Sequence, residues 1–359
     1  MSIETDFESQ HISAMLKRIQ KIDAIYNYAS KEIADRLVRN TLKYGQQGTS
    51  FFRWNRKTEE QIDVILESLR NGVYENIRNG SADAWDIANA KNDMLVKSYL
   101  GNMTVSGEIY AIMHQLNLTA LDAFLNRIVN GLTIFDRVWD LVKVGKNQME
   151  LALSAGIAEG RSAAVLARDI KQSLNEPDKL FRRVRDKDGN LVLSKAAQRY
   201  HPGRGVYRSS FKNAMRLTRT EINGAYRQSD YDRRQQLSFV VGIEVHLSAQ
   251  HPAYDICDSM QGRYPKSFIW TAWHPQCICY TTSVLASKEE FKKYLRTGQL
   301  DTKRTITTIP KKAEQYMQQN GDKLRSYNTQ FEWMGNFTQE NKLRVNVSTL
   351  KMPKNTKED

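Results

Sequence analysis

Residues 251–279 read HPAYDICDSMQGRYPKSFIWTAWHPQCIC and hold all three cysteines of the chain and two of its six histidines. Thiolate sulfur and imidazole nitrogen are common zinc ligands, and four such groups close a tetrahedral structural site. The segment supplies four: Cys257, His274, Cys277 and Cys279. His251 and Asp255 are candidate outer or substitute ligands. We therefore expect this segment to fold as a compact knuckle that the rest of the chain positions and supports.

The composition bounds the class of protein. The chain has 359 residues, of which 40% are hydrophobic, which is enough for two or three domains with their own cores. Lys and Arg number 53 against 40 Asp and Glu, giving a formal net charge of +13. Such an excess favours an acidic partner, with nucleic acid the first choice, although it also serves solubility alone.

Three cysteines in a chain of this length do not make a disulfide framework, so we expect a reducing compartment. The first residues, MSIETDFESQ, lack the basic and apolar regions of a secretory signal. The sequence has no run of roughly 18 apolar residues, so it predicts no membrane-spanning helix.

The first half of the chain has helical periodicity. Apolar residues spaced by three and four predict an amphipathic helix from about residue 8 to 38. A capping box at Thr58 and Gln61 starts a second helix, which we expect to end near Asn79-Gly80. Further helices are predicted at 81–101, 107–117, 119–130, 133–143 and 147–157, with one more ending at Leu174. Residues 1–175 therefore form an all-α docking region, in which we find no catalytic constellation.

A basic hairpin follows. Asp188-Gly189-Asn190 stands between apolar, alternating runs, which is typical of a β-hairpin. Between Arg182 and Arg219 there are eleven Lys or Arg against two Asp, with aromatic residues interleaved. Such a stretch can hold phosphates, although it could equally face an acidic protein. The candidate nucleic-acid contacts are Arg182, Arg183, Arg185, Arg199, Arg204 and Arg208.

Residues 209–236 predict one long helix with a polar stripe, and residues 237–247 predict a strand with a bulge at its glycine. A second short strand is predicted at 267–271. Thr and Asn are indifferent helix formers, so the stripe has another purpose than solvation. We expect Arg219, Thr220 and Glu221 to brace the knuckle, chiefly through charge-assisted hydrogen bonds that involve Arg219 as donor and Glu221 as acceptor.

At these residues the chain resembles a known family. RLTRTEINGAYR, then a strand, then HPAYDICDSMQGRYP and WHPQCICYTT look like the C-terminal domain of phage minor head proteins, the Mu-F-like head morphogenesis family. The resemblance covers roughly residues 150–285. Two positions depart from the family pattern: Met260 replaces the second cysteine of the first pair, and Ile278 replaces the arginine between the last two. A thioether is a poor zinc ligand, so a zinc ion would need the four ligands above or would recruit His251 or Asp255.

The resemblance implies a minor structural component of a phage head, associated with portal and capsid proteins, located in the virion head and in the bacterial host cytoplasm during assembly. Contact with packaged DNA fits the basic charge. No enzymatic activity is expected. Two alternatives stay open: a plain DNA-binding protein, and a zinc-dependent hydrolase or nuclease with Glu244, Asp255 or Asp258 as base.

The expected fold class is α+β, with three sequential parts. Residues 1–175 are the helical docking region, and residues 176–285 are the α+β domain with the hairpin, the long helix and the knuckle. Residues 286–359 form a helical extension with a basic tail.

Overall fold

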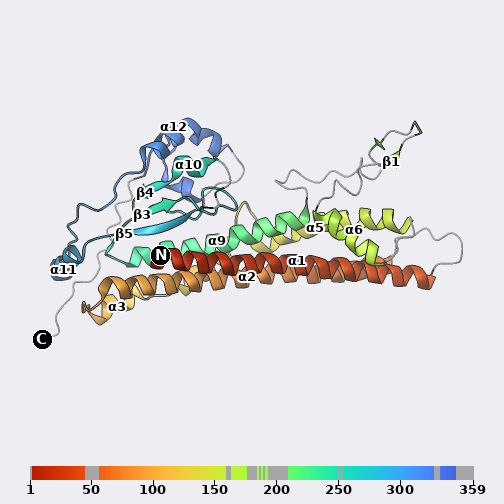
Figure 1. Cartoon of the computed structure of the whole chain (residues 1–359), viewed down its shortest axis with the longest axis horizontal. Helices are drawn as coiled ribbons and strands as arrows, with labels where there is room; N and C mark the ends of the chain where they lie inside the picture. The colour runs from red at the N-terminus through yellow and green to blue at the C-terminus, as the bar shows by residue number, and fades with distance from the viewer. Residues whose placement is uncertain are drawn as a thin grey trace. The chain divides into compact units, whose positions relative to one another are not determined.

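A computed structural model describes residues 2–44, 56–158, 163–175, 184–185, 187–188, 191–192, 209–249, 251, 254–326 and 332–344 (Figure 1). The fold is α+β, as predicted: it is mostly helical, with a small antiparallel sheet of three strands. Within the described ranges, none of the helices combines the length and the apolar character needed to cross a membrane, which agrees with the sequence prediction.

The front half is helical, but with fewer breaks than its sequence indicates. The helices are α1 (Ile3–Tyr44), α2 (Arg56–Leu100), α3 (Gly107–Met113), α4 (Leu118–Leu125), α5 (Ile134–Ala158) and α6 (Ala163–Asn175).

Two predicted helix ends are wrong. α2 runs straight through Gly80 and Ser81, which are both buried, so packing outweighs the roughly 1 kcal/mol that a helical glycine costs. α5 likewise joins two predicted helices. At Gly145 an added Cβ would come within 3.0 Å of the Ser210 hydroxyl oxygen, so this glycine serves a close approach of α9 (Ser210–Gln236) and does not end a helix.

The chain forms two compact units that alternate along the sequence. One comprises residues 1–15, 80–126 and 220–359, and the other comprises residues 16–79 and 127–219. We call the first the sheet unit and the second the helical unit. These units are not the three sequential parts expected from the sequence, which divide at residues 175 and 285; α1, α2 and α9 each contribute residues to both units.

The helical unit has an apolar core. α1, α2, α5, α6 and the first turns of α9 contribute buried residues to it, among them Ile22, Ile33, Ile77, Val138 and Ala214. One polar contact lies beside this core, where the Tyr26 hydroxyl pairs with the Ser210 hydroxyl at 2.9 Å. The predicted hairpin is present as β1 (Val184–Arg185) paired antiparallel with β2 (Leu191–Val192).

The sheet unit is built on β3 (Val240–His246), which lies between β4 (Gly262–Tyr264) and β5 (Tyr280–Leu285), all antiparallel. The predicted bulge is confirmed, since the register shifts between Val240 and Gly242. An added Cβ at Gly242 would be 2.5 Å from a side-chain carbon of Ile306, so only glycine fits there. Thr281 and Ser283 of β5 bond to side chains of α9, which runs beside the sheet (Figure 1).

The strand predicted at 267–271 is wrong: residues 265–279 contain no strand. The aromatic residues that suggested it, Phe268 and Trp270, are buried in the core instead. The backbone of Ile269 does not need a neighbouring strand, because the Asn336 side chain accepts from its N–H at 2.9 Å and donates to its carbonyl at 2.8 Å.

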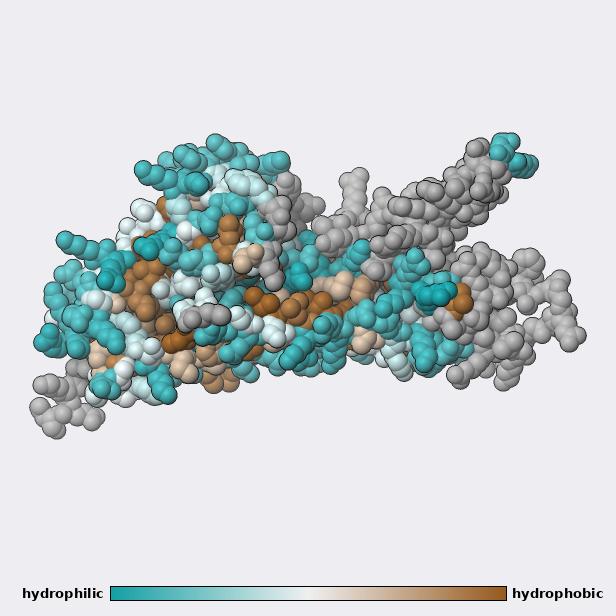
Figure 2. Space-filling model, viewed as in Figure 1, coloured by the Kyte–Doolittle hydropathy of each residue, from teal (hydrophilic) through white to brown (hydrophobic). Residues whose placement is uncertain are grey.

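The elements of the C-terminal extension are α11 (Lys288–Thr297), α12 (Lys311–Arg325) and the 3₁₀ helix η1 (Glu332–Asn336). α12 and η1 pack into the core that holds Phe268 and Trp270, whereas α11 packs into a separate cluster with Tyr99 and Phe239. The indole N–H of Trp333 in η1 donates to the carbonyl of Trp273 at 3.1 Å, and both rings are fully buried. On the face shown in Figure 2, hydrophilic residues cover the outer side of α12. The extension therefore closes the aromatic core that lies beside the cysteines.

Candidate metal centre and its polar support

The structure brings the zinc-type ligands of the knuckle together. The Cys257 sulfur lies 3.2 Å from His274 Nε2 and 3.8 Å from the Cys277 sulfur, and these three ligand atoms all lie within 4.8 Å of one another. Zinc bonds of about 2.3 Å to sulfur and about 2.0 Å to nitrogen give tetrahedral edges of about 3.8 Å and about 3.5 Å. The residues present therefore fit a tetrahedral zinc ion.

Local structure holds these ligands in place. Cys257 stands in the first turn of α10 (Ile256–Met260), where Asp255 caps the helix by accepting from the Cys257 N–H at 2.6 Å. His274 and Cys277 are joined by a turn in which the Cys277 N–H donates to the His274 carbonyl at 3.1 Å. Gln276 takes a left-handed conformation in this turn, with φ of 63°.

The imidazole of His274 faces the Cys257 sulfur with its Nε2, at 3.2 Å. Its Nδ1 lies 2.8 Å from the carbonyl oxygen of Pro275. In the tautomer whose Nδ1 donates to this carbonyl, Nε2 would be the ligating atom. This tautomer is the one that a metal-ligating histidine with a carbonyl partner adopts.

Cys279, the fourth candidate ligand, is fully buried, and its thiol interacts with the thiols of both Cys257 and Cys277. Its sulfur does not belong to the group of three ligand atoms that lie within 4.8 Å of one another. Hydrogen bonds from the other two thiols hold the pKa of Cys277 well below its usual value, with Arg227 adding to the effect. The Cys277 thiolate in turn contributes to raising the pKa of Cys279 to about 12, against the lowering effect of Cys257. The lone pairs of three thiols thus converge on one buried place.

The predicted outer ligands lie next to this cluster. One carboxylate oxygen of Asp255 is 3.2 Å from His274 Nε2, and the other is 3.6 Å from His251 Nε2. His251 also pairs with Asp258 at 2.9 Å. Met260 is fully buried in the aromatic core.

Side chains of α9 form hydrogen bonds with the backbone of the knuckle. The Thr220 hydroxyl accepts from the Gln276 N–H at 3.3 Å, and the Asn223 side chain donates to the Cys277 carbonyl at 3.2 Å. Arg227 donates to the carbonyls of both Cys277 and Cys279, at 2.9 and 2.6 Å. These residues recur at intervals of three and four, so they share one face of the helix.

Of the three residues of the predicted brace, Thr220 forms the bond to the loop described above. Glu221 is buried at 1% exposure, and Arg219 is half-buried, with its Nε making no hydrogen bond. The sequence reasoning placed Asn223 on the polar stripe without giving it a role, and it missed Arg227. The three-and-four spacing from Thr220 was the signal that could have found them.

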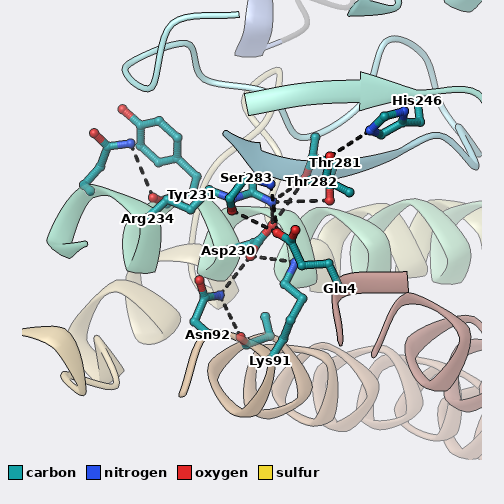
Figure 3. A network of polar contacts seen from close by, with 12 residues as sticks. Glu4, Lys91, Asn92, Asp230, Tyr231, Arg234, His246, Thr281, Thr282 and Ser283 are labelled. Carbon is teal, nitrogen blue, oxygen red and sulfur yellow. Dashed lines mark hydrogen bonds and ion pairs between the residues drawn. The ribbon is translucent and has the colours of Figure 1, made fainter. Parts of the chain in front are cut away.

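A second polar cluster lies between α9, α2, β5 and the start of α1 (Figure 3). Asp230, 1% exposed, forms ion pairs with Lys91 at 2.7 Å and with Arg234. Burial opposes the charged form of Asp230, but the two cations outweigh it and lower its pKa. Glu4 accepts from both the N–H and the hydroxyl of Ser283 at 2.9 Å. Of these residues, only Asp230, a member of the polar stripe, stood out in the sequence.

His11 links the start of α1 to the knuckle. Its Nε2 donates to the Asn223 side chain at 2.8 Å, and its ring stacks on Tyr226 with centroids 4.0 Å apart. Burial lowers the pKa of His11 to about 3, so the ring is neutral. Glu8, one helical turn earlier, has its pKa raised by burial. Asn223 therefore joins His11 to the carbonyl of Cys277.

Two further sets of residues were predicted from the sequence, the nucleic-acid contacts and the catalytic bases. Five of the candidate nucleic-acid contacts lie outside the described residues: Arg182, Arg183, Arg199, Arg204 and Arg208. Arg185 lies on β1, where only its backbone is described. Of the three candidate bases, Glu244 pairs with Arg263 at 3.0 Å, and Asp255 and Asp258 form the capping box of α10.

Comparison with known proteins found no match, whether with family models, with curated proteins or with solved structures.

Proposed function

We propose that the chain is a minor structural protein of a phage head, of the Mu-F-like kind that its RTE helix and Cys/His loop resemble, and that the loop binds one structural zinc ion. The observation that carries this proposal is that Cys257, His274 and Cys277 lie close together, at spacings that suit a tetrahedral ion. Side chains of α9 donate hydrogen bonds to the backbone carbonyls of the same loop. The helix bearing the Arg-Thr-Glu sequence and the cysteine loop thereby act as one module.

The ligands would be Cys257, His274, Cys277 and Cys279. A zinc ion held by three thiolates and an imidazole is a structural cross-link, because a catalytic ion keeps a coordination position open for water or substrate. Here all three thiols are buried, and the adjacent carboxylates of Asp255 and Asp258 serve to cap α10. The module thus favours anchoring over a reaction.

In the head, the module would anchor the chain to portal and capsid proteins, and the excess of basic residues would face DNA or acidic protein surfaces. Mass spectrometry of purified virions from the source phage tests this role. We expect the chain in few copies per particle and enriched with the portal after mild disruption. Its absence from complete particles would contradict the proposal.

The metal is tested on the purified chain. Elemental analysis should find about one zinc per chain, and removal of zinc by a chelator should lower the Tm. Cys277→Ser should bind no zinc, whereas Met260→Leu, a change of similar volume in the adjacent core, should keep it. Less than about a tenth of a zinc per wild-type chain would overturn the metal centre.

The two alternatives give different results in simple assays. A zinc-dependent nuclease would lose its turnover in Asp255→Ala, whereas we expect no turnover in the wild type. A plain DNA-binding protein would lose affinity steeply as salt rises, because each phosphate contact releases a counterion.

A further inference from the structure

Arg227 is a buried cation behind the cysteine loop. It is 5% exposed, and it donates to three carbonyls of that loop: Thr271 at 2.8 Å, Cys277 at 2.9 Å and Cys279 at 2.6 Å. Its guanidinium lies 4.7 Å from the centre of the Trp270 ring. The planar fork of an arginine suits such a set of acceptors, and a lysine could not reproduce it.

The other buried cations near this end of α9 have carboxylate partners. Arg234 and Lys91 share Asp230, and Arg233 pairs with Asp93. Arg227 forms no ion pair with a carboxylate in the part of the chain that the structure describes. Glu8 interacts electrostatically with Arg227, but burial raises the pKa of Glu8 and so favours its neutral form. A buried charge without a counter-charge is costly, so Arg227 calls for a negative partner.

The cysteine cluster supplies that partner once it holds a metal. Zinc carries two positive charges, and three thiolates with a neutral imidazole leave the centre with a net charge of about −1. Two of the ligating cysteines are the residues whose carbonyls Arg227 holds. The same guanidinium therefore fixes the ligand backbone and lies beside the negative charge.

We propose that Arg227 is the positioning and charge-compensating residue of the metal centre, which lets a buried site use three thiolates. The inference rests on the proposed zinc site. It makes the site selective for thiolate-seeking divalent ions such as Zn²⁺ and Co²⁺, because these ions favour the anionic ligand set that Arg227 balances.

The test compares Arg227→Lys and Arg227→Gln with the wild type by chelator competition for Zn²⁺. Changes to groups that orient metal ligands typically weaken metal affinity by about 10 to 100-fold. We expect a loss of that size in Arg227→Gln and a smaller loss in Arg227→Lys, which keeps the charge. Co²⁺ spectra report the number of thiolate bonds, and the thiolate charge-transfer intensity should fall in the same order.

Arg233→Met is the matched control, because Arg233 is also buried on α9 and also donates to a backbone carbonyl, that of Met113. It should lower the Tm while leaving the Zn²⁺ affinity within about threefold of the wild type. Equal affinity of Arg227→Gln and wild type, or equal losses in Arg227→Gln and Arg233→Met, would overturn the role of Arg227 alone. A wild-type chain without zinc would overturn the proposed centre itself.

Discussion

The two halves of α9 each bury one face of the helix, but the first half buries apolar residues and the second half buries charged residues. The first half buries Phe211 and Ala214 in the apolar core of the helical unit. The second half, in the sheet unit, buries Arg227, Asp230 and Arg233 at 5% exposure or less. The side chains of a buried apolar face need only fill the available volume, so apolar residues of similar size can replace one another. Each side chain of a buried charged face needs its particular charged partner, because a buried charge without a partner carries a desolvation cost.

The largest effect expected from this contrast is at Asp230. Asp230→Ala leaves Lys91 and Arg234 buried without their carboxylate, which should cost about 3–5 kcal/mol in the free energy of unfolding. Asp63→Ala is the control: Asp63 pairs with Lys146 in the helical unit, but its side chain is 53% exposed, so the loss should stay below about 1 kcal/mol. Urea denaturation measures both, and equal losses would remove the contrast.

A smaller effect, which depends on pH, is expected at His11. Its pKa is about 3 in the folded chain against an ordinary value of 6.5, because burial, Lys91 and Arg227 all disfavour the charged ring. The stability that this depressed pKa contributes is present above pH 6.5 and is lost as pH falls toward 3. At pH 5 the loss should be about 2 kcal/mol relative to pH 7.

His11→Gln removes the titrating group while keeping a donor for Asn223. Its unfolding free energy should therefore depend less steeply on pH between 7 and 5, measured by denaturant titration at each pH. Glu8 cannot imitate this behaviour: its raised pKa contributes stability at low pH that is lost as pH rises. A variant with the slope of the wild type would show that His11 does not titrate on unfolding.

The smallest effect is expected from two threonines that stand two residues apart on α9. Thr220→Val removes the acceptor for the Gln276 N–H and should cost about 1 kcal/mol. The hydroxyl of Thr218 is buried without a hydrogen-bond partner, so Thr218→Val should be neutral or slightly stabilising. Thermal unfolding of the two variants, which have the same change in shape, gives the comparison. A larger loss at Thr218 would contradict it.

Features encoded over short distances could be predicted from the sequence. The three-and-four spacing indicated α1, Asp188-Gly189 indicated the hairpin, and Gly242 marked the bulge in β3. The cysteines and His274 were found by residue type alone, and three of these four ligands lie within 4.8 Å of one another.

Features that depend on distant partners could not be predicted in this way. A strand was expected where Asn336, 67 residues later in the chain, takes up the backbone bonds of Ile269. Helix ends were expected at Gly80, where burial overrides propensity. The support of the knuckle was expected from Arg219, Thr220 and Glu221; Thr220 bonds to the loop, and Asn223 and Arg227, to which the sequence reasoning assigned no role, bond to it as well.

The seating of Trp333 against Trp273 has a practical consequence for anyone preparing shortened versions of this protein. A fragment cut at residue 285, where composition suggests a natural end, would leave the backbone of Ile269 without Asn336 and the Trp273 ring open to water. Such a fragment should tend to aggregate in solution. A cut placed after residue 344 keeps those contacts and is the shorter form to try first.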